Sequence, residues 1–89
     1  MRSLGELRGE IDEIDGRIAR LLRRRFEVVD EISEAKRGSG APVSDPSREA
    51  AILSRVAAEA GERFADDAKR VFSSVFEVSK SRQRGARLQ

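Results

Sequence analysis

Two cations lie on what is otherwise the apolar stripe of a long helix. Positions 4, 7, 11, 14, 18, 21, 25, 28, 32 and 35 follow alternating steps of three and four residues. Nine of these ten positions are apolar, and the exception is Arg25. Lys36 follows eleven residues after Arg25, about 20° away around a helix, so both cations share one side. A buried charge is costly unless it is paired, so each cation requires either an internal carboxylate or a bound anion.

Two polar residues continue a second apolar stripe near the end of the chain. The apolar part of this stripe consists of Ala68, Val71, Phe72, Val75 and Phe76. Ser79 and Gln83 extend it with the i,i+4 spacing of a helix. Together with the cations, they predict a hydrogen-bonding, positively charged pocket inside a helical bundle, suited to a small polyanion. The simpler alternative is that long side chains such as Arg25 reach solvent or pair internally.

The composition restricts the chemistry that such a pocket can perform. The chain has no His, Cys or Tyr, so the usual general base and thiol nucleophile are missing, as are thiolate metal sites. We therefore expect no metal and no cofactor, and a reaction that depends on charge and orientation. Its 18 basic and 16 acidic residues give a net charge of +2, which does not indicate nucleic-acid binding. No apolar run suggests a membrane span or a signal peptide, and we expect a cytoplasmic protein.

The stripes and their end signals predict three helices and no strand. The first helix covers about residues 4–37 and ends at the GSGAP sequence of residues 38–42. The second covers 46–60, with Asp45 as N-cap, Pro46 in the first turn and Gly61 at its end. The third covers 65–84 and precedes a flexible tail, 85–89. We expect an all-α, three-helix protomer in a single domain spanning residues 1–89.

The helix lengths predict an assembly of two copies. The first helix is about 50 Å long, whereas the later two measure about 22 Å and about 30 Å. The short helices cannot cover the whole apolar stripe of the long one. A second copy with its long helix antiparallel to the first would cover the remainder, which predicts an intertwined antiparallel homodimer.

Three segments of the chain resemble the AroQ-type, all-helical chorismate mutases in order, spacing and length. They are "LRGEIDEIDGRIARLLRRRFEVVDEISEAK", "PVSDPSRE" and "SVFEVSKSRQ", and the resemblance extends from about Leu4 to Gln83. It implies a homodimer of three-helix protomers. It also implies conversion of chorismate to prephenate, the branch step towards phenylalanine and tyrosine.

The resemblance also implies roles for individual residues. Arg25 and Arg8 of the partner subunit would hold a substrate carboxylate. Lys36 would contact the ether oxygen and a carboxylate, and Gln83 would donate a hydrogen bond to the same ether oxygen. Arg8 and Arg25 of one chain are seventeen residues apart, about 26 Å along a helix, which is too far to hold one small dianion. If two antiparallel helices cross near Gly16, Arg8 of one chain lies beside Arg25 of the other.

The remaining lining implied by the resemblance consists of Asp45, Arg48, Glu49 and Ser79, with Glu49 holding the substrate hydroxyl. The implied reaction is a unimolecular [3,3] rearrangement, which requires no acid, base, metal or covalent intermediate. The enzyme would restrain the substrate in a compact conformation and stabilise negative charge that develops on the ether oxygen.

Other functions remain open at this stage. An isochorismate-pyruvate lyase could use the same helices, although Asp45 and Glu49 favour the mutase, because the resemblance implies that such lyases lack this pair. An aminodeoxychorismate mutase also remains open, since an amine could replace the hydroxyl opposite Glu49. A non-catalytic helical dimer that binds nucleic acid or protein would have no use for Arg25, Lys36 and Gln83 together. Lys80 adds a cation for which the sequence suggests no role. The basic residues after Gln83 are a candidate docking segment for another enzyme of the pathway.

Overall fold

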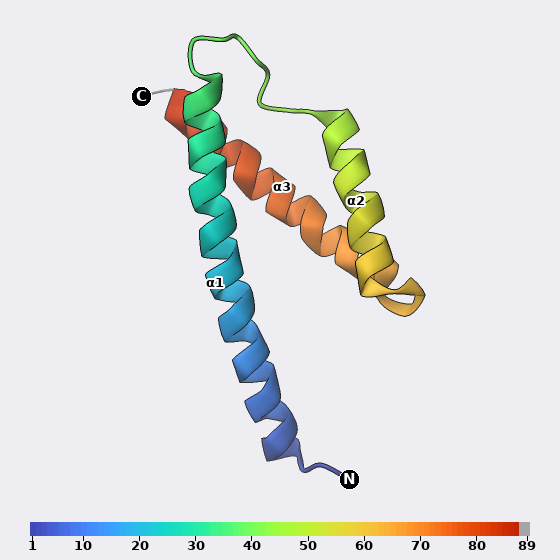
Figure 1. Cartoon of the computed structure of the whole chain (residues 1–89). Helices are drawn as coiled ribbons and strands as arrows, with labels where there is room; N and C mark the ends of the chain where they lie inside the picture. Colours follow the sequence, from blue (N-terminus) through green and yellow to red (C-terminus); the bar gives the residue numbers. More distant parts are fainter. Residues whose placement is uncertain (88–89) are drawn as a thin grey trace.

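The computed structural model of the chain describes residues 1–87 and contains three α-helices (Figure 1). They are α1 (Leu4–Lys36), α2 (Pro46–Ala60) and α3 (Ala65–Arg87), with a short 3₁₀ turn, η1 (Glu62–Phe64), before α3. The described part of the chain contains no strand, so the prediction of an all-α, three-helix protomer is confirmed. Among these residues, no helix has both the length and the apolar character needed to cross a membrane.

Helix α1 is a single rod of 33 residues, and it determines the length of the molecule. It begins with a capping box in which Ser3 Oγ accepts from the Glu6 amide at 3.1 Å and Glu6 Oε1 accepts from the Ser3 amide at 3.3 Å. The protomer measures 57 × 26 × 14 Å. The N-terminal half of α1 extends beyond the region where α3 crosses it (Figure 1).

Helix α2 begins and ends at the residues that the sequence indicates. Asp45 Oδ1 accepts from the Arg48 amide at 3.1 Å, and Pro46 occupies the first turn. The helix ends at Gly61, whose φ of 84° lies in the left-handed region that favours glycine.

Helix α3 extends past its predicted end at residue 84 and continues to Arg87. Residues 85–87 of the predicted flexible tail are therefore helical, and the last two residues of that tail lie outside the described residues. One glycine, Gly85, does not end the helix because its cost in a helix is only about 1 kcal/mol. Arg84 also places a positive charge near the helix C-terminus, where it interacts favourably with the negative end of the helix dipole.

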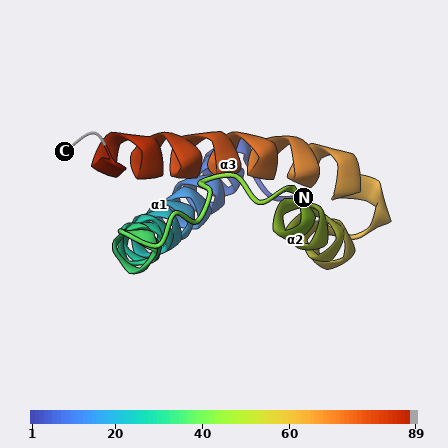
Figure 2. The same ribbon diagram turned by 90° about the horizontal axis from the view of Figure 1, so that it is seen from above.

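Helices α1 and α2 both pack against α3 and lie on the same side of it (Figure 2). The side of α1 that meets α3 includes the stripe residue Arg25, which donates a hydrogen bond to Ser79, and also residues beside the stripe. Val29 is buried and Phe26 is half-buried, whereas Leu21 and Ile32 on the stripe are 68% and 42% exposed. The apolar surface of α1 is wider than one stripe, and α3 covers only one side of it.

An ion pair joins α1 and α3 where they cross. Arg82 donates from Nε to Asp30 Oδ1 at 3.1 Å and from Nη2 to Asp30 Oδ2 at 2.6 Å. The Arg82 guanidinium also lies 5.8 Å from the centre of the Phe26 ring. The bidentate bond lowers the pKa of Asp30 and raises the pKa of Arg82. Because Ser79 and Gln83 are close to Arg82 along α3, this pair holds both of them beside α1.

A large apolar surface of α1 stays exposed in the single chain. We call it the N-terminal apolar stripe, and it consists of Leu4, Leu7, Ile11, Ile14, Ile18 and Leu21. In the described residues, the buried apolar side chains are Val29 and Phe76, and the buried polar ones are Ser79 and Gln83. Exposed apolar surfaces of this extent are typical of interaction sites.

Candidate active site

One cavity of about 400 Å³ is lined by all three helices and by the segment that precedes α2. Seven of the eight predicted site residues line it: Arg25, Lys36, Asp45, Arg48, Glu49, Ser79 and Gln83. They come from positions that are far apart in the sequence, and the packing of α1 and α2 against α3 brings them together. The eighth predicted residue, Arg8, does not line the cavity.

Arg25 is a half-buried cation on the cavity wall. It donates from Nη1 to Ser79 Oγ at 2.7 Å, and Ser79 Oγ donates in turn to the Val75 carbonyl at 2.8 Å. Its guanidinium lies 5.8 Å from the centre of the Phe76 ring. Burial lowers the pKa of Arg25, and the nearby charge of Arg48 lowers it further. A guanidinium nevertheless stays charged, and Arg25 forms no ion pair with a carboxylate of the described residues.

Lys36 and Gln83 lie together at another part of the wall. Lys36 Nζ donates to the Pro42 carbonyl at 3.0 Å and lies 3.5 Å from Gln83 Oε1, at the outer limit of a hydrogen bond. Gln83 is 8% exposed. Because its Oε1 faces the ammonium group, its Nε2 amide remains available as a donor to a ligand. Lys36 likewise has no carboxylate partner within residues 1–87.

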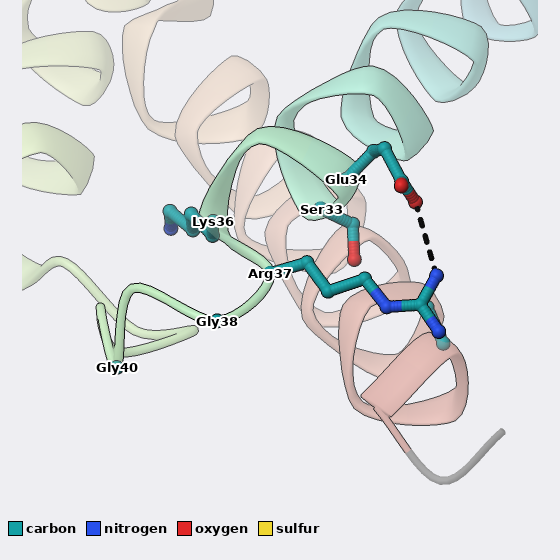
Figure 3. Close-up of a pocket in the computed structure, with 7 residues that line it drawn as sticks. Ser33, Glu34, Lys36, Arg37, Gly38 and Gly40 are labelled. Carbon is teal, nitrogen blue, oxygen red and sulfur yellow. Dashed lines mark ion pairs between the residues drawn. The ribbon is translucent and has the colours of Figure 1, made fainter.

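A second hollow, of about 580 Å³, lies between the end of α1, the following loop and α3. Lys36 belongs to its wall, but Figure 3 shows the Lys36 nitrogen directed away from the other labelled side chains. The charged groups on this side, Glu34 and Arg37, pair with each other at 3.5 Å. The ammonium of Lys36 therefore belongs to the three-helix cavity.

The side of the cavity formed by α2 carries the acidic groups. Asp45 caps the helix, and Glu49 lies one turn further along. Glu49 Oε1 is 3.5 Å from Lys80 Nζ, which also lies 3.1 Å from Glu77 Oε1. The hydrogen bond to Glu77 makes the largest contribution to raising the pKa of Lys80, and the charge of Glu49 raises this pKa further. The sequence alone gave Lys80 no role, because no pattern in one chain shows that α2 and α3 bring it to Glu49.

The cavity wall combines positive charge with an apolar surface. Its cationic side chains are Arg25, Lys36, Arg48 and Lys80, and its acidic ones are Asp45 and Glu49. The wall thus has an excess of two positive charges. The apolar residues are Val28, Val29, Ile32, Val43, Ile52 and Phe76. This combination fits a small dianion with an apolar ring. The described residues contain no group of acidic side chains that could hold a metal ion.

Arg8 lies on the N-terminal half of α1, exposed to solvent. It is seventeen residues before Arg25, which corresponds to about 26 Å along the helix. A single chain therefore does not bring Arg8 to the cavity.

The chain is similar in sequence to known proteins. The family model described as chorismate mutase type II matches residues 7–84. A chorismate mutase of Methanocaldococcus jannaschii is 31% identical over 86 residues, which cover 94% of this chain and 87% of that protein. No solved structure matches the chain.

Longer proteins contain a similar segment. The T-protein of Haemophilus influenzae is 38% identical over 53 residues, which cover 60% of this chain and 14% of that protein. The bifunctional chorismate mutase/prephenate dehydratase of Aquifex aeolicus is 41% identical over 56 residues, which cover 63% of this chain and 16% of that protein. The match of the family model across residues 7–84 shows that the chain belongs to the chorismate mutase type II family.

Proposed function

We propose that this chain is a chorismate mutase, an isomerase that converts chorismate to prephenate in the biosynthesis of phenylalanine and tyrosine. The observation that carries the proposal is the pair of cations, Arg25 and Lys36, which line one cavity and have no carboxylate partner among residues 1–87. The excess of two positive charges that one chain places on the wall is opposite in sign to the charge of a substrate with two carboxylates and favours its binding. We further propose that residues 1–89 form one domain and that the enzyme acts in the cytoplasm.

In the proposed mechanism, the cavity orients the substrate and supplies electrostatic stabilisation. Arg25 binds a carboxylate, with its guanidinium held by Ser79 and the Phe76 ring. Lys36 and the Gln83 amide face the ether oxygen, where negative charge grows as the carbon–oxygen bond breaks. Donors fixed at such a position stabilise the transition state more than the ground state. Restraint of the substrate in a compact conformation lowers the entropic part of the barrier.

The residues on the α2 side of the cavity support the proposal that chorismate, and not a related compound, is the substrate. We propose that Glu49 accepts a hydrogen bond from the ring hydroxyl, with Asp45 and Arg48 completing this wall. A carboxylate placed for one hydroxyl position discriminates against isomers, because buried polar groups without partners are costly. An isochorismate-pyruvate lyase and an aminodeoxychorismate mutase are the rival functions on this fold.

Product identification tests the proposed function. Purified protein should convert chorismate to prephenate, and it should form little salicylate from isochorismate at the same concentration. The measurement is the loss of chorismate absorbance together with chromatographic identification of the product. Salicylate as the main product, or no reaction with chorismate, would contradict the proposal.

We propose that two copies form an intertwined antiparallel homodimer and that Arg8 of the partner subunit completes each cavity. The exposed N-terminal apolar stripe supports this assembly, since a second copy would remove it from water. The arrangement of α1 also supports it. Arg8 and Arg25 lie on opposite sides of Gly16 at nearly equal separations, so an antiparallel crossing there would place one beside the other. In such a shared site, Arg25 of one chain and Arg8 of the partner subunit would contact the substrate from opposite sides.

We also propose that the basic end of the chain, after Gln83, docks on another enzyme of the same pathway. Arg84 is exposed there on the last turns of α3. Support comes from the bifunctional protein of Aquifex aeolicus, in which the similar segment is 16% of a longer chain. Docking on such an enzyme would bring two activities of one pathway close together.

A further inference from the structure

Lys80 is a charged residue of the cavity wall that the proposed mechanism leaves without a role. Its side chain is 17% exposed and comes from α3, whereas Glu49 comes from α2 and is 27% exposed. The two groups lie 3.5 Å apart and so connect two helices across the cavity wall. On its outer side Lys80 is held by Glu77, which is 68% exposed. The ammonium of Lys80 is therefore fixed beside the carboxylate of Glu49.

This ion pair changes what Glu49 can bind. A carboxylate with no cation beside it would attract either a hydroxyl or an ammonium group of a ligand, and the ammonium more strongly. In this cavity the ammonium of Lys80, which Glu77 also contacts at 3.1 Å, lies 3.5 Å from Glu49 and offsets part of its charge. Glu49 can still accept a hydrogen bond from a neutral hydroxyl, because a carboxylate has about four acceptor positions. A ligand ammonium at the same place would lie close to a second positive charge.

We propose that Lys80 is a specificity-determining residue that restricts the ring position facing Glu49 to a neutral hydroxyl and excludes an amine. The inference rests on the proposed function, in which Glu49 holds the ring hydroxyl of the substrate. Lys80 acts through Glu49 and through its own charge, and it need not touch the reacting atoms. Repulsion between two unit charges a few ångströms apart in a partly buried site is enough to change affinity by about tenfold or more.

The test compares chorismate with 4-amino-4-deoxychorismate, which carries an amine in place of the ring hydroxyl. The inhibition constant of the amine is measured against chorismate conversion and divided by the KM for chorismate. In Lys80→Met, this ratio should fall about tenfold relative to the wild type, because the repulsion is lost. Lys80→Arg should keep the wild-type ratio. Lys69→Met removes an exposed lysine of the same helix and should change nothing.

Each other outcome has a defined meaning. If Lys80→Met weakens binding of both compounds equally, Lys80 holds a carboxylate that the two share, and the inference is wrong. An unchanged ratio in Lys80→Met also overturns it. If Lys80→Met is poorly folded by circular dichroism, the neutral variant Lys80→Gln gives the same comparison. A wild-type protein that does not convert chorismate would refute the proposed function itself, before any variant is measured.

Discussion

Replacement of Lys36 by alanine should lower kcat by about 100- to 1,000-fold while the protein stays folded. The ammonium of Lys36 is held by the Pro42 carbonyl and lies beside Gln83 Oε1, without a carboxylate partner in the described chain. We propose that it meets the negative charge that develops on the ether oxygen. Loss of one fixed donor at such an atom typically costs about 2.7–4 kcal/mol in the transition state.

The lysines of this chain provide a matched control for this experiment. Lys69 lies on the exposed side of α3, so Lys69→Ala should retain wild-type turnover. Circular dichroism and thermal unfolding would show that both variants are folded. Lys36 also connects α1 to the loop before α2 through Pro42, so a rise in KM is expected in addition to the loss of kcat. Near-normal kcat in Lys36→Ala would exclude Lys36 from the reacting centre.

Replacement of Gln83 by glutamate should make the reaction rate strongly dependent on pH, whereas the wild-type rate should depend on pH only weakly. An amide donates a hydrogen bond at any ordinary pH because it does not titrate. The chain has no His or Cys, so no group of the proposed mechanism has an unperturbed pKa between pH 5 and 8. The wild-type rate should therefore be nearly constant over this range.

A glutamate at position 83 donates a hydrogen bond only while it is protonated. Its ionised form would repel the charge that grows on the ether oxygen, so Gln83→Glu should lose about 100-fold or more near neutrality. Activity should return as the pH falls towards the carboxyl pKa, which the neighbouring Lys36 would lower. The measurement is kcat/KM against pH for both proteins. A variant as active as the wild type, with an equally flat profile, would mean that Gln83 does not face the breaking bond.

The helices and most of the cavity could be predicted because local signals determine them. Asp45, Pro46 and Gly61 mark the ends of α2, and the same residues stand there in the structure. The polar continuation of the α3 stripe predicted that Ser79 and Gln83 face inward, and both are buried. Arg25 and Lys36 could be placed on one side of α1 from their spacing alone.

Contacts between helices could not be predicted in the same way. The Asp30–Arg82 pair and the Lys80–Glu49 pair join residues 52 and 31 positions apart, and the sequence contains many other charges that could pair. The stripe also did not show how the apolar surface of α1 divides between α3 and solvent, although Arg25 on the stripe does contact Ser79 of α3. Leu21 and Phe26 are both apolar, and the periodicity cannot say which of two adjoining surfaces meets α3 and which stays exposed.

The most direct test of a shared chorismate site combines two inactive variants, Arg8→Ala and Arg25→Ala. In a heterodimer of these chains, one cavity carries both substitutions and the other carries neither. After the two are unfolded and refolded together, random pairing should restore roughly a quarter of the wild-type rate of prephenate formation. Each variant refolded alone should stay inactive. No recovery in a mixture shown to contain heterodimers, or full activity of Arg8→Ala alone, would contradict a cavity formed by both chains.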